Sequence, residues 1–263
     1  MLLNFISWHV NPEIFHIGHF AIRWYGLLFA LSFYFGYLII NQMFKKEGVP
    51  QKVLDQLTTY MLIGTVIGAR LGHVLFYEPA WYFSHPLDIL KIWEGGLASH
   101  GAAIGILLAL WIFSKKSKRP FLWTIDRIVI VVALSGLLIR TGNLMNSEIF
   151  GKPTSLPWGF IFEHYDEVPR HPTQIYEGFS YLAIFLFLLN YYYRKNGAPT
   201  QGVCFGIFLI ATFTMRFLIE FLKEPQVGFE SKMVLNMGQL LSIPLILLGI
   251  GILIWTKQKR KTA

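Results

Sequence analysis

Seven runs of apolar residues, separated by shorter polar segments, dominate the sequence. Each run is about 16–21 residues long, roughly the length with which an α-helix crosses the hydrocarbon core of a bilayer. The pattern predicts an all-α, polytopic membrane protein with about seven transmembrane helices in a single transmembrane domain, residues 1–263. The runs cover residues 21–40, 57–77, 97–113, 125–139, 175–193, 202–222 and 236–256.

Two of the segments between the runs differ from simple loops. Residues 78–96 are amphipathic and rich in aromatic side chains, which predicts a segment lying in the membrane interface. Residues 141–174 are too polar and too rich in proline to span a membrane. We expect this second segment to form a small extracytoplasmic arm or lobe.

Composition and charge exclude several classes of protein. Of the 263 residues 54% are hydrophobic and only 14% are charged, whereas soluble domains carry about 25% charged residues. The net charge is +8, and clusters of lysine and arginine follow the first, third, fifth and seventh runs. The positive-inside rule then places the N-terminus outside and the C-terminus inside. The basic charge is an orientation signal, and no nucleic-acid partner is expected. The lone cysteine, Cys204, cannot form an intramolecular disulfide and is interpreted as a small core residue.

Ionisable residues inside the apolar runs concentrate at one predicted depth. Such residues are costly within a bilayer and are therefore functional candidates. On the predicted topology they come from five spans and all lie in the outer half of the membrane, which predicts one polar cavity there. Asp126 and Arg127, at the cytoplasmic end of the fourth run, are explained by snorkelling to the interface. The outer set consists of Tyr25, Arg70, His73, His100, Arg140, Arg216 and Glu220, and Asn143, Asn146 and Glu148 follow Arg140 closely.

This inventory favours chemistry on a phosphate. No zinc-ligand spacing and no phosphate-binding loop of the Gly-rich Lys type occurs in the sequence, so neither a metal nor a cofactor is expected. Arginines hold phosphate by forked hydrogen bonds, and a histidine can accept a proton near neutral pH. A lipid phosphate that is both ligand and leaving group fits two arginines and one histidine.

Structural roles stay open for several of these residues. Arg216 and Glu220 are four residues apart on one helix face and could neutralise each other. His100 could be a satisfied interfacial histidine, and Asn143 and Asn146 could tie helix ends together. Arg70 and His73 are interpreted as packing or lipid-contact residues. Glycines at a spacing of four, such as Gly64, Gly68 and Gly72, favour close helix packing.

Several motifs, in order along nearly the whole chain, resemble prolipoprotein diacylglyceryl transferase. Three of them are GLASHGAAIG at 96–105, IRTGNLMNSEIFG at 139–151 and RHPTQIYE at 170–177. The others are RWYGLLFA at 23–30, GARLGHVLFY at 68–77, RFLIEFLKEPQ at 216–226 and MGQLLSIP at 237–244. The family is a bacterial seven-span membrane enzyme with the N-terminus outside, in agreement with the charge pattern.

The resemblance implies a reaction, its partners and its site. It implies transfer of diacylglyceryl from phosphatidylglycerol to the thiol of the lipobox cysteine in the signal peptide of a prolipoprotein, within the bacterial cytoplasmic membrane. A thioether forms and glycerol-1-phosphate is released. By resemblance the catalytic residues are His100, Arg140 and Arg216, and the substrate-binding residues are Tyr25, Arg140, Asn143, Asn146, Glu148, Gly151, Arg216 and Glu220.

The sequence departs from the family pattern at three positions. Ala102 replaces the second glycine after the histidine, Ile139 replaces the glycine before the first arginine, and Thr212 replaces a tyrosine four residues before the second arginine. These departures bear on the shape of the cavity rather than on the reaction. The alternative function is a lipid or anion transporter with an arginine-lined site in the outer leaflet. Such a transporter usually binds near the midplane and has paired broken helices.

Overall fold

The structure is a computed structural model that describes residues 5–18, 20–224 and 233–262. The chain divides into two compact units. Unit 1 combines residues 1–39 with 126–263, and unit 2 comprises residues 40–125. Two of the helices begin in one unit and end in the other.

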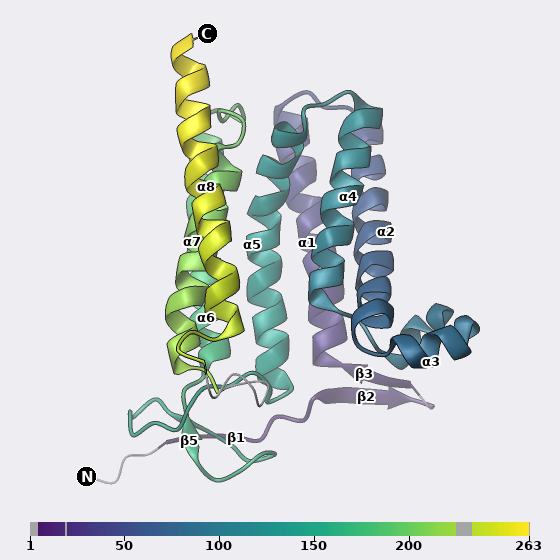
Figure 1. Cartoon of the computed structure of the whole chain (residues 1–263), viewed down its shortest axis with the longest axis vertical. Coiled ribbons are helices and arrows are strands. Elements are labelled where there is room, and N and C mark those ends of the chain that lie inside the picture. The colour runs from purple at the N-terminus through teal and green to yellow at the C-terminus, as the bar shows by residue number, and fades with distance from the viewer. Residues whose placement is uncertain (1–4, 19, 225–232, 263) are drawn as a thin grey trace. The chain divides into compact units, whose positions relative to one another are not determined.

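Long helices account for most of the described chain, and each of the seven apolar runs lies on one of them (Figure 1). Five of the helices, or helix segments, are long and apolar enough to cross a membrane, namely Trp24–Lys46, Gln51–Phe76, Phe121–Met145, Val203–Leu222 and Met237–Lys259. The protein is thus a largely helical, multi-pass membrane protein. The long helices are α1 (Trp24–Lys46), α2 (Gln51–Phe76), α4 (Ser99–Ser117), α5 (Phe121–Met145), α6 (Thr173–Arg194), α7 (Val203–Ile219) and α8 (Met237–Thr262).

Unit 2 is built on close contact between α2 and α4. A Cβ added to Gly68 would lie 2.5 Å from the carbonyl oxygen of Gly101 and 2.8 Å from Cα of Gly105. A Cβ on Gly64 or Gly72 would meet the same helix at similar distances. The glycines predicted to favour helix packing therefore do so, because only a missing side chain lets the two backbones touch.

The segment after α2 forms three short helices, α3 (Pro79–Ser84), η1 (Pro86–Leu90) and η2 (Ile92–Glu94). Arg70 is only 4% exposed, and its guanidinium donates hydrogen bonds to backbone oxygens within this segment. The acceptors are the carbonyls of Asp88, Ile89, Gly95 and Gly96, at 2.5–3.2 Å. Arg70 thus has a structural role within unit 2.

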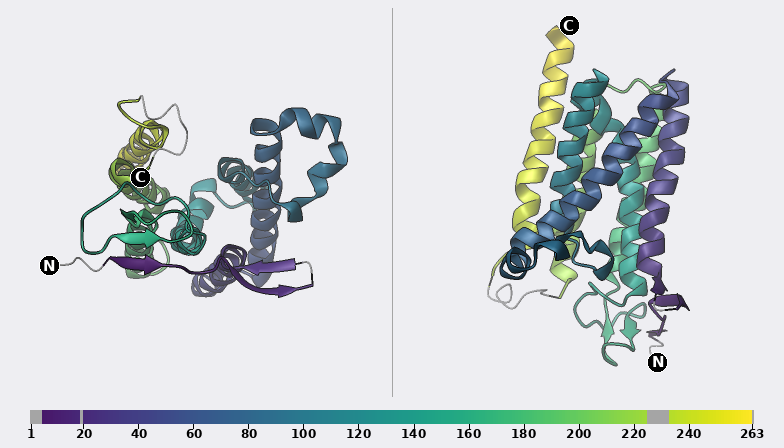
Figure 2. Two further views of the ribbon diagram at one scale, coloured as in Figure 1. Left: turned by 90° about the horizontal axis from the view of Figure 1, so that it is seen from below. Right: turned by 90° about the vertical axis from the view of Figure 1, so that its right-hand side faces the viewer.

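Two small sheets belong to unit 1 and were not predicted from the sequence. Strands β2 (Glu13–Ile17) and β3 (Phe20–Arg23) form an antiparallel hairpin that leads directly into α1 (Figure 2). The other sheet has the order β1-β4-β5, with β1 (Ile6–Trp8) parallel to β4 (Phe160–Phe162) and β5 (Pro169–Arg170) antiparallel to β4. The N-terminal segment is therefore part of the lobe that follows α5.

A small core closes this lobe against the end of α5. Leu144, Phe160 and Phe162 are buried together, and Trp8 packs against them. The indole Nε1 of Trp8 donates a hydrogen bond of 3.0 Å to the carbonyl oxygen of Leu144. Because α5 continues to Met145, the first residues of the predicted 141–174 segment are helical, and the irregular part begins at Asn146.

The start of α7 is fixed by a buried carboxylate from α5. Asp126 is fully buried and accepts hydrogen bonds from the backbone N–H groups of Gly202, at 2.6 Å, and Phe205, at 2.8 Å. Arg127 is 2% exposed and donates to the carbonyl of Gly197. The snorkelling interpretation was wrong for this pair, because Asp126 satisfies the free N–H groups of a helix N-terminus. Cys204, beside them, is buried with a free thiol, as predicted.

Helix α8 packs along α7 in unit 1 (Figure 1). Its first turn is held by a reciprocal capping box, in which Asn236 Oδ1 accepts from the N–H of Gln239 and Gln239 Oε1 accepts from the N–H of Asn236. Gly238 lies against Glu220, since a Cβ there would be 2.6 Å from the carboxyl carbon. The end of α7 and the start of α8 are thereby brought to the same place.

Candidate active site

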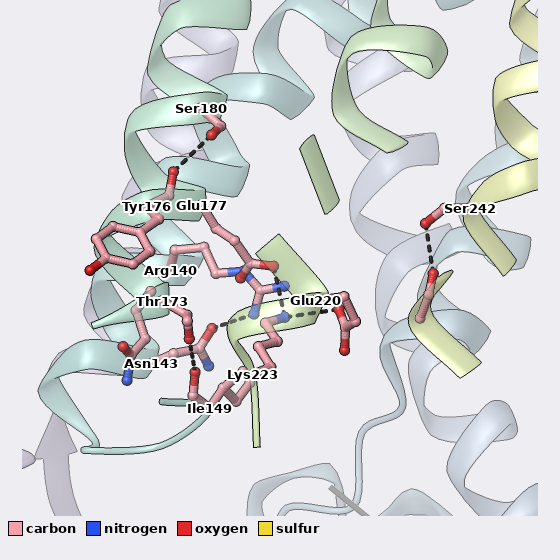
Figure 3. A network of polar contacts seen from close by, with 12 residues as sticks. Arg140, Asn143, Ile149, Thr173, Tyr176, Glu177, Ser180, Glu220, Lys223 and Ser242 are labelled. Carbon is pink, nitrogen blue, oxygen red and sulfur yellow. Dashed lines mark hydrogen bonds and ion pairs between the residues drawn. The ribbon is translucent and has the colours of Figure 1, made fainter. Parts of the chain in front are cut away.

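A buried network of charges joins the ends of α5, α6 and α7 in unit 1 (Figure 3). Arg140 Nε lies 2.6 Å from Glu177 Oε2, and Lys223 Nζ lies 2.7 Å from Glu177 Oε1. Glu177 and Lys223 are each only 4% exposed. One carboxylate therefore bridges two cations in a setting with little water, where ion pairs are strong but costly to break.

A second layer of the network lies at the C-terminal end of α5. Arg140 Nη1 donates to Asn143 Oδ1 at 3.0 Å, and Asn143 Nδ2 donates to Glu148 Oε1 at 2.7 Å. Asn146 Nδ2 reaches the same oxygen at 3.3 Å, and Gln174 Nε2 donates to the Glu148 carbonyl at 2.6 Å. The structure thus brings together four predicted residues, Arg140, Asn143, Asn146 and Glu148. The asparagines tie the helix end to the lobe, one of the two roles left open by the sequence.

The second predicted pair, Arg216 and Glu220, is arranged differently from the expectation. Glu220 is 7% exposed and lies 3.5 Å from Lys223 Nζ, on a 3-10 turn η3 (Glu220–Leu222) that follows α7. Within the part of the chain that the structure describes, Arg216 has no ion-pair partner. The mutual neutralisation of Arg216 and Glu220 is therefore not observed, since Lys223 takes the place of the arginine. Arg216 instead lines a small cavity between α6 and α7.

Two further predicted residues lie at the edge of the network. The ring of Tyr25, at the start of α1, packs against α5 where Gly142 leaves room, because a Cβ on Gly142 would be 2.9 Å from Tyr25 Cδ2. Tyr25 is within electrostatic reach of Glu148 and Arg140. Gly151 lies where three segments cross, and a Cβ there would be 2.5 Å from the carbonyl oxygen of Leu222. Gly151 thus contacts protein backbone and allows the lobe to approach the end of α7.

Charged residues outside the spans hold the lobe together. Arg170 is 8% exposed and pairs with Asp166 Oδ2 at 2.6 Å and with Glu224 Oε1 at 2.7 Å. The Arg170 guanidinium holds the pKa of the Asp166 carboxyl below its ordinary value. Burial lowers the pKa of His171, so this imidazole is neutral at pH 7. His171 Nδ1 lies 3.2 Å from the hydroxyl oxygen of Tyr176.

His100 belongs to unit 2, whereas the residues of this network belong to unit 1. It is the second residue of α4, is exposed, and its ring lies 5.7 Å from that of Tyr77 and 5.6 Å from that of Phe76. The ring of His73 also stacks on that of Tyr77, at 5.5 Å. An exposed imidazole is accessible to a proton donor, and its role as a base stays a prediction.

The charges define what the network in unit 1 can bind. Arg140 and Lys223 are matched by Glu177 and Glu220, whereas the Glu148 carboxylate is held by two asparagine amides. Among the described residues, the N–H donors of the Arg216 side chain are therefore available to bind an anion. Guanidinium groups bind phosphate oxygens in pairs. The described residues contain no group of three or more His, Cys, Asp or Glu side chains placed to hold a metal ion.

Sequence reasoning missed Glu177 and Lys223. Glu177 lies in the motif RHPTQIYE, and Lys223 lies in the motif RFLIEFLKEPQ. The last two residues of the second motif, 225 and 226, are outside the described chain. Glu177 is an ionisable residue inside the apolar run 175–193, so the argument that selected Arg140 would also have selected it. Lys223 was assigned to a connecting segment, because its burial depends on how η3 turns back towards α6.

Comparisons with known proteins identify the family of this chain. The sequence profile described as prolipoprotein diacylglyceryl transferase matches residues 12–255. A phosphatidylglycerol–prolipoprotein diacylglyceryl transferase of Tolumonas auensis is 47% identical over 256 residues, which are 97% of this chain and 99% of the relative. Enzymes of the same name from Chloroherpeton thalassium and Porphyromonas gingivalis are 44% and 45% identical, covering 94% and 95% of this chain and 92% and 94% of the relatives. The chain therefore belongs to the prolipoprotein diacylglyceryl transferase family.

Proposed function

We propose that this protein transfers the diacylglyceryl group of phosphatidylglycerol to the lipobox cysteine thiol of prolipoproteins. The products are a thioether on the cysteine and glycerol-1-phosphate. Full-length relatives that carry this name support the reaction. The observation in the structure that carries the proposal is the cation Arg216, which lines a cavity beside the paired Arg140 and Glu177. Such a site suits the phosphate of a lipid headgroup.

In the proposed mechanism the arginines act on the leaving group. The cysteine thiolate attacks the glycerol carbon that is bonded to a phosphate oxygen, a carbon–sulfur bond forms, and the carbon–oxygen bond breaks. The electron pair of that bond leaves with the phosphate, whose charge Arg216 stabilises. Arg140 already forms an ion pair with Glu177 through Nε and a hydrogen bond to Asn143 through Nη1, so it contributes its positive field and a fixed position rather than a free fork.

His100 is the proposed base for the thiol proton. A free thiol has a pKa of about 8.5, so a neighbouring base speeds its ionisation at neutral pH. Tyr25, Asn143, Asn146, Glu148, Gly151 and Glu220 are the proposed substrate-binding residues, whether by direct contact or by holding the arginines. In His100→Gln most turnover should be lost at pH 7 and partly restored as the pH rises, because more thiol ionises unaided. Wild-type turnover of that variant at pH 7 would exclude a base role.

The proposed setting is the bacterial cytoplasmic membrane, with seven spans, the N-terminus outside and residues 146–172 in an extracytoplasmic lobe. The 78–96 segment is proposed to lie in the membrane interface. Its large apolar side chains support this position, because Phe83, Leu87 and Trp93 are 72%, 76% and 70% exposed and aromatic residues favour the headgroup region.

A direct assay tests the function. Purified protein in phosphatidylglycerol vesicles is mixed with a lipobox peptide, and the peptide mass is measured. A mass gain equal to one diacylglyceryl group on the cysteine, absent when the cysteine of the peptide is replaced by serine, is the expected result. Arg216→Ala should abolish the gain. Movement of lipid or phosphate without any mass gain would favour the transporter instead.

A further inference from the structure

Thr212 has a buried hydroxyl group without a hydrogen-bond partner among the residues that the structure describes. The residue is 6% exposed and lies one turn before Arg216 on α7. Several other threonines on the helices donate to the carbonyl oxygen four residues earlier, as Thr65 does to Met61 at 2.7 Å and Thr141 to Leu137 at 2.9 Å. A buried polar group without a partner is destabilising, so such a group calls for an explanation.

A cavity beside Thr212 explains why its hydroxyl has no partner. It lies between α6 and α7, has a volume of about 10 Å³, and offers room for roughly one water-sized group. Its apolar wall consists of Ile184, Met215 and Ile219, and its polar wall of Glu177, Ser180, Tyr181, Thr212 and Arg216.

Within the polar wall, Thr212 is the residue whose O–H group is not already donated to an acceptor among the described residues. Ser180 donates to the carbonyl of Tyr176 at 2.8 Å (Figure 3), and the Tyr181 hydroxyl lies within electrostatic reach of Arg140. The Glu177 carboxylate faces two cations, Arg140 and Lys223, so its negative charge is largely compensated. Beside this carboxylate, whose Oε2 has no hydrogen-bond partner among the described residues, the cavity presents one hydroxyl and one guanidinium to an incoming group.

Both of these groups are suited to an anionic oxygen. Residues four apart on a helix lie on the same face, so Thr212 and Arg216 line one side of the cavity together. The guanidinium carries only donors, and a threonine hydroxyl can donate as well. Phosphate oxygens accept several such bonds at once.

We propose that Thr212 is a ligand-binding residue whose hydroxyl donates a hydrogen bond to a phosphate oxygen held by Arg216. The proposal rests on the proposed function, since the phosphate is that of the phosphatidylglycerol headgroup. The same oxygen chemistry is present in the released glycerol-1-phosphate. Loss of one hydrogen bond to a charged group should lower kcat/KM for the lipid by about tenfold.

The test compares two substitutions that differ only in the hydroxyl. Thr212→Val keeps the branched shape and removes the donor, whereas Thr212→Ser keeps the donor. Thr65→Val is the matched control, because Thr65 is 5% exposed and its hydroxyl is satisfied within its own helix. Transfer is measured by peptide mass, and stability by the midpoint of thermal unfolding in detergent.

We expect Thr212→Val to lose about tenfold in kcat/KM, mainly through KM, while its unfolding midpoint stays equal to or above that of the wild type. Thr212→Ser and Thr65→Val should transfer at nearly the wild-type rate. Wild-type kinetics in Thr212→Val would overturn the proposal, and so would equal losses in the valine and serine variants, which would indicate a role in packing alone.

Two further measurements distinguish the lipid phosphate from the released glycerol-1-phosphate, and failure of this proposal from failure of the proposed function. Inhibition by glycerol-1-phosphate should also weaken in Thr212→Val, but a change confined to this inhibition would assign the hydroxyl to the released phosphate and contradict its role toward the lipid. Native mass spectrometry of phosphatidylglycerol bound to the detergent-solubilised protein does not require turnover. If the wild type failed to transfer, the proposed function would fall, and weaker lipid retention by Thr212→Val would still support the subsite.

Discussion

Glu177 is the residue on which the geometry of Arg140 depends. Its carboxylate meets Arg140 at 2.6 Å and Lys223 at 2.7 Å, and all three side chains are largely shielded from solvent. A buried carboxylate between two cations fixes both of them, because either cation would otherwise be left without compensation. The position of Arg140, a proposed catalytic residue, is thus set by a neighbour on another helix.

We predict that Glu177→Gln destabilises the protein by about 3–5 kcal/mol, because it leaves the buried Lys223 without its main counter-charge. Transfer should fall as well, since Arg140 loses the acceptor that orients its Nε edge. The measurement is the unfolding free energy in detergent together with kcat. Glu163→Gln is the control, because Glu163 is exposed and its side chain has no ion-pair partner among the described residues.

A double substitution distinguishes charge compensation from shape. Adding Lys223→Met to Glu177→Gln removes the uncompensated cation, so part of the lost stability should return. If the two substitutions were simply additive, Glu177 and Lys223 would not be coupled, and the network would be a set of independent contacts.

The residues of the site could be predicted from the sequence only in part. Arg140, Asn143, Asn146 and Glu148 were predicted from two arguments, the free-energy cost of ionisable residues inside a membrane and the family motifs. The structure joins these four residues by hydrogen bonds. The partner of Glu220 could not be predicted, because the expected pairing with Arg216 uses helix spacing alone, and α7 ends at Ile219. After that point the 3-10 turn brings Lys223, rather than Arg216, to the carboxylate.

At the scale of elements, the length of the apolar runs predicted the helices well, but it did not predict the short strands. Every apolar run lies on a helix, since about 20 apolar residues have few other ways to satisfy their backbone in a membrane. Strand β1 has three residues and pairs with β4, more than a hundred positions away. Such a strand is too short to show an alternating pattern, and its partner is chosen by the packing of Trp8 on the lobe.

The contact between α2 and α4 makes a quantitative prediction. Gly68→Ala should destabilise unit 2 by about 1–3 kcal/mol, because the new methyl group would lie 2.5 Å from the Gly101 carbonyl oxygen and would force the helices apart. Gly251→Ala on α8 is the control, since nothing lies within 4 Å of a Cβ there. Thermal unfolding in detergent compares the two, and equal midpoints would contradict the close contact.

The lobe should lose stability in acid. Arg170 holds the pKa of Asp166 below its ordinary value, so the pair contributes stability above the unfolded pKa. That contribution is lost as the pH falls through the lowered value of the folded state, below about pH 4. The protection of the β4 amides and of the Arg170 amide against hydrogen exchange, expressed relative to the intrinsic rate at each pH, should therefore decrease in this range. Asp166→Asn should exchange faster at neutral pH and lose the dependence, and an unchanged profile in that variant would exclude Asp166 as its source.

At the scale of the whole molecule, orientation in the membrane decides which side the site faces. Lys115 and Lys116 end α4, and Lys45 and Lys46 end α1. Basic residues at these helix ends favour the cytoplasm. The network of Arg140 and Glu177 lies at the opposite end of α5 from Asp126. With the basic ends inside, we propose that this network lies in the outer leaflet, where it would meet phosphatidylglycerol and secreted precursors.

Cysteine labelling tests that orientation, because the chain has a single, buried cysteine. In a Cys204→Ser background, Glu167→Cys places an exposed thiol in the lobe and Lys116→Cys places one at the end of α4. We expect a membrane-impermeant maleimide to label Glu167→Cys in intact spheroplasts and to label Lys116→Cys only after the membrane is permeabilised. The parent should stay unlabelled and, since Cys204 is far from the site along α7, should keep its transfer activity.

The reverse labelling pattern would invert the topology and move the site to the cytoplasmic leaflet. Labelling of both positions from outside would contradict the number of spans between them.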